Sequence, residues 1–397
     1  MRKAIFAAAA PALLFALLTG CQQGKTPTQK EEATLEWNGA RSAVLASLAN
    51  EQYRSGNFDK CQKTIDEAMR LTPQSEPLHL LAGKLAIETG KLERAEEELK
   101  LARQYNPSDP EAYYFTGVIY QRWLKPQTAL EYYQQAAGRA PAELAYVMAQ
   151  AEMLVAMDRS SEALDLLQGK VTYFEHSGAI RDAVGQLLMN AGKYPEAVAM
   201  LREASILSED DPAIHCRLGV ALYYAKEYRE ASEVIGRLVQ TDAYQKRADL
   251  FTMLGQCQLN LGKAREARYS FETASQLDQY NAHVWQCLGR AALELGDYRR
   301  AEMSLARSLR LDPSHSETHL LMGYLRVRQN RLPDALKAFN KAAELDQNDT
   351  VSLCMVGYTL QKMGKNDEAL RCYAKALRIK PGDEMAHQLI VEADQRQ

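Results

Sequence analysis

The sequence predicts an all-α solenoid of about ten stacked helix-turn-helix repeats. A 34-residue period starts at Ser42 and keeps one register through ten copies, with two extra residues near Lys246 and Arg247. Position 8 of the repeat is Gly or Ala in every copy, position 20 is Ala in every copy but the first, and position 24 is always large and apolar or aromatic. Such a period is the signature of a repeat architecture. The residues at position 8 are Ala49, Gly83, Gly117, Ala151, Gly185, Gly219, Gly255, Gly289, Gly323 and Gly357.

Each copy is predicted to form a helix, a turn and a second helix. Small residues at positions 8 and 20 let two antiparallel helices approach closely, because no branched side chain holds their backbones apart. We expect the residue at position 8 to face the residue at position 20, with the large residue at position 24 filling the adjoining space. A proline at position 32 then ends the second helix in five copies. These prolines are Pro73, Pro107, Pro141, Pro313 and Pro381.

With these residues in view, the chain resembles the tetratricopeptide repeat family over residues 42 to 383. That family carries a large residue at position 4, Leu at 7, Gly at 8, Ala at 20, an aromatic residue at 24, Ala at 27 and Pro at 32. The eighth copy matches with Trp285, Leu288, Gly289, Ala301 and Pro313 but departs at positions 24 and 27. The resemblance implies a right-handed superhelix, which we interpret as one continuous array. The expected starts lie near residues 42, 76, 110, 144, 178, 212, 248, 282, 316 and 350.

Two segments depart from the repeat pattern. The fourth copy has Lys170 at position 27 and no proline at the end of its second helix. It is either a degenerate spacer or a local change in the pitch of the superhelix. Residues 384–397 keep Met385, Leu389 and Ile390 among polar residues, so we expect a capping helix that covers the last exposed face.

The N-terminal segment has the features of an export signal. Arg2 and Lys3 precede an apolar run over residues 4–18, and Leu-Thr-Gly-Cys follows, ending at Cys21. This resembles a bacterial lipoprotein signal, which implies removal of residues 1–20, a lipid on Cys21 and a flexible tether over residues 21–41. The alternatives are an ordinary secretory signal with an incidental cysteine, or a membrane-spanning anchor, for which the apolar run is short.

The same resemblance gives an expected location. It implies that the protein is anchored by a lipid in the bacterial cell envelope and faces the periplasm. Gln22, the residue after the lipidated cysteine, favours the outer membrane.

Charge and cysteine content narrow the function classes. The formal net charge is −3, both signs are spread along the chain, and no basic track suited to nucleic acid is present.

Six cysteines follow Cys21. Cys61 stands at position 20 and is expected to be a small core residue. For Cys257 and Cys287, a disulfide and two free thiols both stay open.

The sequence offers little support for catalysis, a cofactor or a metal. Gly24, Lys25 and Thr26 resemble the end of a phosphate-binding loop, but the preceding glycine is one residue too near. His315 and His319 are four residues apart, and with no third ligand evident a surface pair is favoured over a metal site. We therefore predict no enzymatic activity and no cofactor.

Partner binding is the remaining function class. In the tetratricopeptide family, positions 2, 5, 9, 12 and 13 of the first helices line a concave groove. Tyrosine and arginine there suit an extended peptide or a partner helix, although each tyrosine could equally pack between repeats. The candidate groove residues are Tyr114, Val118, Arg122, Met148, Tyr223, Tyr224, Arg290, Tyr324, Arg328 and Tyr358.

The function predicted from these observations is a membrane-anchored scaffold that binds protein or peptide partners in this groove. It would help to assemble a cell-envelope complex such as a pilus, a secretion channel or the outer-membrane machinery. The alternative is a docking subunit of a polysaccharide-export or peptidoglycan-processing enzyme system. The oligomeric state stays open.

Overall fold

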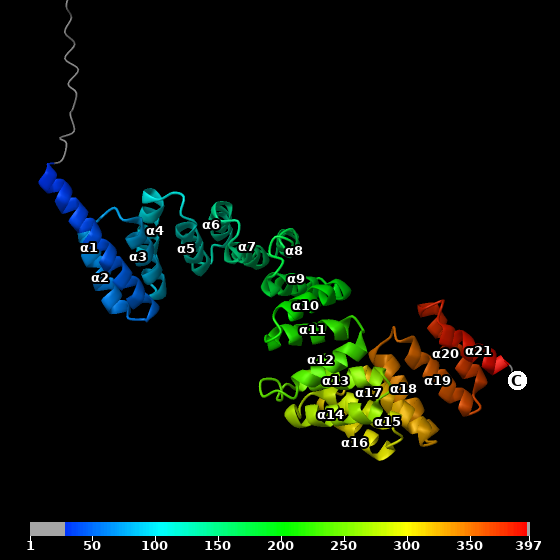
Figure 1. The fold of residues 1–397 in the computed structure, drawn as a ribbon. Coiled ribbons are helices and arrows are strands. Elements are labelled where there is room, and N and C mark those ends of the chain that lie inside the picture. The colour runs from blue at the N-terminus through cyan, green and yellow to red at the C-terminus, as the bar shows by residue number, and fades with distance from the viewer. Residues whose placement is uncertain (1–27, 395–397) are drawn as a thin grey trace, which may run out of the picture. The chain divides into compact units, whose positions relative to one another are not determined.

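The computed structural model describes residues 28–394, and all regular structure in that range is α-helical (Figure 1). The chain divides into two compact units, Met1–Tyr146 and Val147–Gln397, and the boundary falls inside helix α7 (Leu144–Ala156). This boundary lies in the fourth predicted copy, and the single continuous array stays a prediction. The predicted signal peptide and Cys21 lie outside the described residues.

The first unit contains three helix pairs. In each pair the two helices pack on one another. The pairs are α1 (Gln29–Arg54) with α2 (Phe58–Leu71), α3 (Glu76–Glu88) with α4 (Leu92–Tyr105), and α5 (Pro110–Arg122) with α6 (Pro126–Arg139).

The second unit continues the same arrangement. It holds the rest of α7, then α8 (Ser160–Gln168) and six packed pairs. The pairs are α9 (Gly178–Asn190) with α10 (Tyr194–Leu207), α11 (Pro212–Tyr224) with α12 (Tyr228–Leu238), α13 (Ala248–Asn260) with α14 (Ala264–Leu277), α15 (Ala282–Glu294) with α16 (Tyr298–Leu311), α17 (Ser316–Arg328) with α18 (Leu332–Leu345), and α19 (Thr350–Lys362) with α20 (Asn366–Ile379).

A final helix, α21 (Glu384–Asp394), packs on α19 and α20. Its Leu389 is buried in the last hydrophobic cluster, and Met385 and Ile390 lie against that cluster. The expected capping helix is therefore confirmed.

The predicted tether is wrong over residues 29–41, because α1 begins at Gln29. Thr28 and Glu31 form a capping box, in which the backbone N–H of Thr28 donates to Glu31 Oε2 at 2.7 Å. The residues that follow are mostly Glu, Lys, Ala and Leu, which have high helix propensity. The polar composition that suggested a tether also suits the exposed part of a long helix.

The two helices of a pair contact each other through position 8 of the first helix and position 24 of the second. A Cβ added to Gly289 would lie 2.6 Å from Leu305 Cδ2, and one added to Gly255 would lie 2.6 Å from Phe271 Cε1. The glycine thus contacts the large residue at position 24, because the Cβ direction in a helix brings the side chain at 24 across the gap left by the glycine.

Position 20 also lies against position 8, as expected from the sequence. A Cβ on Gly83 would lie 3.5 Å from the Ala95 carbonyl oxygen, and Cys61 Sγ donates to the Ala49 carbonyl oxygen at 3.3 Å. Alanines at position 20 are fully buried beside it.

The turn inside each repeat needs a left-handed residue at position 15. Six copies place Gly there with a positive φ, and the other four place Leu124, Asp158, Lys226 and Asn330 with φ between 56° and 64°. This residue ends the first helix and reverses the chain direction. Glycine suits the position because it has no Cβ to clash with the carbonyl oxygen.

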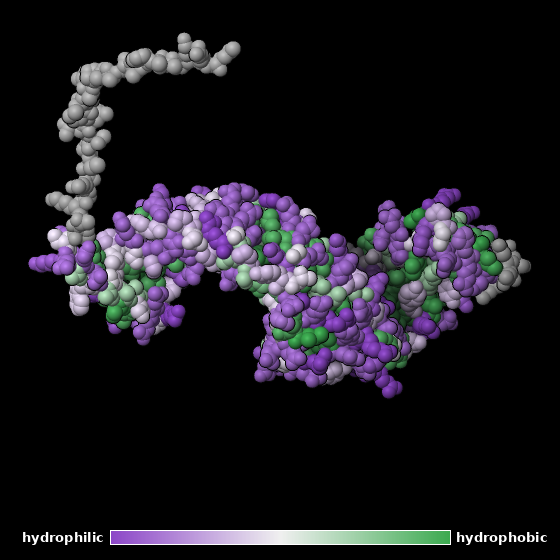
Figure 2. Space-filling view, turned by 45° about the horizontal axis from the view of Figure 1, so that its top comes forward, coloured by the Kyte–Doolittle hydropathy of each residue, from purple (hydrophilic) through white to green (hydrophobic). Residues whose placement is uncertain are grey.

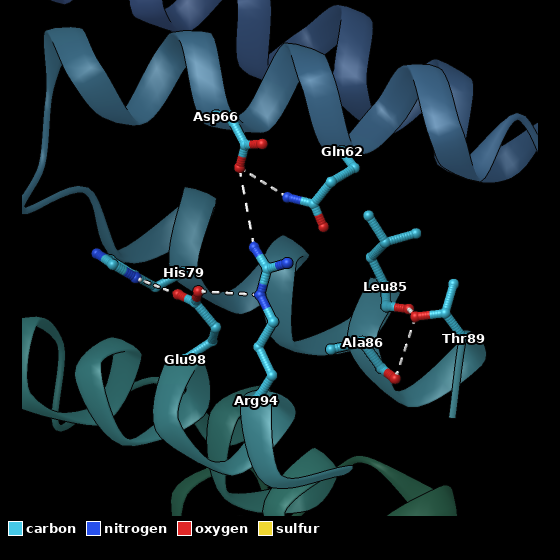
Figure 3. A network of polar contacts seen from close by, with 8 residues as sticks. All are labelled: Gln62, Asp66, His79, Leu85, Ala86, Thr89, Arg94 and Glu98. Atoms are coloured by element: carbon cyan, nitrogen blue, oxygen red, sulfur yellow. Dashed lines mark hydrogen bonds and ion pairs between the residues drawn. The ribbon is translucent and has the colours of Figure 1, made fainter. Parts of the chain in front are cut away.

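A buried histidine ties three helices of the first unit together (Figure 3). His79 Nδ1 lies 2.7 Å from Glu98 Oε2, and its Nε2 lies 2.9 Å from the Pro73 carbonyl oxygen. Both partners accept hydrogen bonds, and a neutral imidazole has only one N–H, so the ring satisfies both only as the cation. The hydrogen bond to Glu98 accordingly raises the pKa of His79. Arg94 then links Glu98 to Asp66 of α2, at 3.7 and 3.8 Å.

Hydrophilic residues cover most of the face drawn in Figure 2, and apolar residues appear on it as separate patches. Within residues 28–394, each helix is too short or too polar to pass through a bilayer.

Replacing Gly289 by Ala should destabilise the second unit by about 1 to 3 kcal/mol, because the new methyl group overlaps Leu305. Chemical denaturation measures this change. Adding Leu305→Ala should remove the overlap, so the two effects should not add. In the control Gly138→Ala, no atom lies within 4 Å of the new methyl group, and a gain of about 0.5 to 1 kcal/mol is expected.

The damage in Gly289→Ala should also stay local, because each repeat contacts only its neighbours. Hydrogen exchange should rise in α15, α16 and the adjoining pairs and stay unchanged in the first unit. Equal loss of protection along the whole chain would contradict this expectation.

The first unit should lose stability as pH rises through the folded pKa of His79. That pKa lies above the ordinary value of 6.5, so the contribution of the cation is complete below about 6.5 and disappears above the raised value. Losing one of the two hydrogen bonds costs about 1 to 3 kcal/mol. Hydrogen exchange in α3 and α4 from about pH 5 to about pH 9 tests the effect.

The matched control for this titration is His79→Gln, whose side chain does not titrate. His79 is the sole histidine between residues 28 and 146. A profile as steep in His79→Gln as in the wild type would therefore show that another group is responsible.

Candidate protein-binding surface

The predicted groove residues all lie on first helices, namely α5, α7, α11, α15, α17 and α19. We call the side chains at positions 2, 5, 9, 12 and 13 of these helices the first-helix surface. The surface is described separately for each unit.

In the first unit, the predicted residues support the fold. The Tyr114 ring lies 5.0 Å from Tyr146 and 5.5 Å from Tyr133, centroid to centroid. Val118 packs against the core cluster formed by α3, α4 and α5. Arg122 is exposed, but its Nη1 donates to the carbonyl oxygen of Ile87 at 2.7 Å, near the end of α3.

Two adjacent tyrosines of α11 have different environments. The hydroxyl of Tyr223 donates to Gln256 Oε1 of α13 at 2.5 Å, and burial raises the pKa of Tyr223 to about 12, so the hydroxyl stays protonated at neutral pH. Tyr224 is 46% exposed and stacks on Tyr194, with ring centroids 5.1 Å apart. Tyr223 therefore links neighbouring repeats, whereas Tyr224 is open to a partner.

The contact made by Tyr223 continues into a third repeat. Gln256 Nε2 lies 3.0 Å from His283 Nε2 and 3.6 Å from Cys287 Sγ, both on α15. Burial lowers the pKa of His283 and raises the pKa of Cys287 to about 12, so both groups stay neutral near pH 7. Cys257 and Cys287 are free thiols, and the disulfide considered from the sequence is not formed.

In the last two first helices, a tyrosine at position 9 is followed four residues later by a cation. Tyr324 and Arg328 stand on α17, and Tyr358 and Lys362 stand on α19. Tyr324 packs edge-on against Phe339 at 5.4 Å, and both tyrosines border the same hydrophobic cluster. The Lys362 ammonium lies 5.5 Å from the Tyr358 ring centre. Arg328 is exposed and has no ion-pair partner within residues 28–394.

The two remaining candidates differ in exposure. Arg290 of α15 is exposed, with its Nε 3.6 Å from Glu294 on the same helix. Met148 of α7 is half-buried.

Rings at position 4 have a structural role that the sequence analysis missed. The ring N–H of Trp285 donates to the carbonyl oxygen of Gln279 at 2.9 Å, six residues earlier. In the same way, His319 Nε2 lies 2.9 Å from the carbonyl oxygen of Pro313, also six residues earlier. This contact gives a structural role to His319, one of the two histidines considered as a metal site. No group of three or more metal-binding side chains is found in the described part of the chain.

Two grooves lie between second helices and contain none of the predicted residues. One runs between α10 and α12, with a volume of about 800 Å³, and the other runs between α14 and α16, with a volume of about 680 Å³. The first helices α11 and α15 form their floors. We call them the α10–α12 groove and the α14–α16 groove.

Three family models match parts of this chain. A tetratricopeptide repeat model matches residues 53–117, and a second model, described as TPR repeat, matches residues 185–224. The model of the cilia and flagella-associated protein 70 C-terminal domain matches residues 237–397.

Curated relatives are distant. The BBSome complex member BBS4 of Bos taurus is 23% identical over 227 residues, which cover 57% of this chain and 43% of BBS4. The Mus musculus protein of the same name matches with the same identity and coverage. This chain thus spans less than half the length of the curated relatives that it matches.

Solved structures with similar folds share little sequence with this chain. The APC/C hetero-tetramer Cut9–Hcn1 gives a TM-score of 0.48 at 13% identity and 91% coverage of both chains. YrrB, described as a TPR protein with an unusual peptide-binding site, gives 0.38 at 20% identity and covers 47% of this chain and 96% of its own. Together with the paired helices, the family models show that this chain contains tetratricopeptide repeats.

Proposed function

We propose that this protein is a non-enzymatic scaffold that binds partner proteins or peptides on its first-helix surface. Tetratricopeptide repeats generally mediate protein–protein interactions, and the matches at residues 53–117 and 185–224 support that role. BBS4, the curated relative, is named as a member of a multi-protein complex. This chain covers 43% of the length of BBS4.

The observation that carries the proposal is the repeated tyrosine and cation on α17 and α19. The tyrosine rings are anchored in the core cluster, so little side-chain entropy is lost when a partner covers them. The cations stand four residues later and are therefore one helical turn away on the same face. A surface of fixed aromatic rings beside exposed charges suits an extended peptide or a partner helix.

The clearest test changes the exposed members of this surface. Tyr224→Ala together with Arg328→Ala should weaken partner binding by more than about 1 kcal/mol, as expected of interface anchors. Both side chains are exposed, and Arg328 has no ion-pair partner within residues 28–394, so helicity should be kept. Affinity capture with the wild type identifies the partner, and titration of that partner measures the loss.

The matched control changes the same residue types on a second helix. Tyr269 of α14 is 71% exposed, and Arg265 of α14 is also exposed. Tyr269→Ala with Arg265→Ala should leave binding unchanged. Equal losses in the two double variants would exclude the first-helix surface as the site.

We also propose that the scaffold is anchored by a lipid on Cys21 and works in the bacterial cell envelope, with the outer membrane favoured by Gln22. The support is the sequence resemblance of residues 1–21 to a lipoprotein signal. In that setting the scaffold would assemble a pilus, secretion or outer-membrane complex. A docking role in polysaccharide export or peptidoglycan processing is the alternative, and the identity of the captured partner separates the two.

If Cys21 carries a lipid, Cys21→Ser should move the protein from the membrane fraction to the soluble fraction. It should also abolish metabolic labelling with a fatty acid, because serine lacks the sulfur atom to which the lipid is attached. Cys372→Ser is the control, since Cys372 is a partly exposed free thiol of α20. Unchanged fractionation and labelling of Cys21→Ser would contradict the anchor.

A further inference from the structure

We propose that the α14–α16 groove is a second docking site, separate from the first-helix surface, and that it binds an acidic peptide segment carrying one large apolar side chain. The groove lies between second helices, so occupancy of the first-helix surface does not block it by direct overlap. Unpaired arginines, an apolar lining with one exposed methionine, and a difference from the equivalent groove earlier in the chain support this assignment.

The groove has more positive charge than its own acids can neutralise. Its two carboxylates, Glu272 and Asp297, both contact Arg300. Glu272 also lies 3.8 Å from Arg268 of its own helix. The other arginines that line the groove make no hydrogen bond or ion pair within residues 28–394. These are Arg299, Arg307 and Arg310.

The apolar part of the groove lies among these arginines. Trp285 and Leu288 of α15 form its floor, and Met303 of α16 stands at its wall with 65% of its surface exposed. The indole N–H of Trp285 is already bound to the Gln279 carbonyl oxygen, which fixes the ring. An exposed, flexible methionine next to a fixed aromatic ring is suited to receive an apolar side chain.

The α10–α12 groove shows that these features do not follow from the repeat itself. It occupies the same place two repeats earlier, and Arg229 and Arg237 correspond to Arg299 and Arg307. However, Glu230 replaces Arg300 and Glu233 replaces Met303.

Three carboxylates, Glu227, Glu230 and Glu233, line the α10–α12 groove with four cations, whereas two carboxylates line the α14–α16 groove with four arginines. Arg202 contacts Glu230 at 2.8 Å and Glu227 at 3.3 Å. Arg229 and Arg237 make no side-chain hydrogen bond or ion pair within residues 28–394 either, but an acid, Glu233, stands where the α14–α16 groove has the exposed Met303. The α14–α16 groove therefore has one acid fewer and an apolar wall that the α10–α12 groove lacks.

The size and charge of the groove favour a peptide over a nucleic acid. Nucleic acids are bound by long basic tracks that follow the phosphate backbone, whereas here the arginines surround a cavity of about 680 Å³ on one repeat pair. The chain as a whole is acidic, with a formal charge of −3. Carboxylates flanking one apolar residue complement both the arginines and the floor.

The test uses the full chain and a fluorescein-labelled peptide in which acidic residues flank a single central leucine. Fluorescence polarisation should show saturable binding that weakens with added salt. The double variant Arg299→Glu with Arg307→Glu should bind the peptide about tenfold more weakly or worse. Replacing the central leucine of the peptide by serine should weaken binding to the wild type in the same direction.

The matched control is Arg229→Glu with Arg237→Glu, which makes the same changes at the same repeat positions in α12. This control should bind the peptide as the wild type does. Circular dichroism should show that both double variants keep their helicity, since all four arginines lie on helix surfaces. Equal weakening in the two variants would show a general charge effect and would overturn the proposal.

Three further outcomes are decisive. Tyr224→Ala with Arg328→Ala should leave peptide binding unchanged, and loss of binding there would assign the peptide to the first-helix surface instead. A single-stranded oligonucleotide that binds as tightly as the peptide, and is lost in the Arg299 and Arg307 variant, would show a general polyanion site and overturn the peptide assignment. Absence of saturable peptide binding to the wild type would also overturn it.

Discussion

The contact between the small residue at position 8, which is glycine in eight of the ten copies, and the large side chain at position 24 is the constraint on which the helix pairs depend. Without a Cβ on Gly323 or Gly357, the rings of Phe339 and Tyr373 lie directly on the backbone of the first helix. This contact sets the distance between the two helices, and the buried alanine at position 20 fits beside it. Since the same contact recurs in successive copies, the spacing of the first helices follows from it.

A fixed spacing lets polar side chains connect one repeat to the next. Tyr223, Gln256 and His283 stand on three successive first helices and form one chain of contacts. Such side chains are held by neighbours and cost little entropy to order. The first-helix surface therefore combines residues that keep the repeats in register with exposed residues, such as Tyr224 and Arg328, that remain free for recognition.

The sequence predicted the helix pairs well because the repeat pattern reports packing directly. Most first helices begin at the residue where the period places a repeat start, for example Glu76 and Ser316. The pattern identifies which positions are buried and that position 8 lies near position 20, but it does not show that the side chain at position 24 makes the tighter contact with the glycine.

Features that depend on the environment of a residue were harder to predict. The exposed half of α1 has the composition of a polar tether, and its capping box was overlooked. In the sequence, the ring at position 4 is only a large residue, although in the structure its ring nitrogen bonds to a carbonyl oxygen of the preceding loop. The two grooves could not be predicted, because each combines residues from neighbouring copies that are about one repeat apart in the sequence.

The ion pairs between second helices show how such a repeat can vary its recognition without changing its fold. In both units, the side chain at position 25 of one copy forms an ion pair with the side chain at position 19 of the next copy. Which of the two positions carries the acid differs from pair to pair. The acid is at position 25 in Asp66–Arg94 and Glu272–Arg300, and the arginine is at position 25 in Arg202–Glu230. All six side chains are at least one-third exposed, and pairs of this kind contribute only about 0 to 1 kcal/mol. The core contact between positions 8 and 24 therefore does not depend on which member of each ion pair is positive. Charge on the second helices is free to be set by what binds there, which explains how two grooves with the same backbone geometry have different electrostatic character.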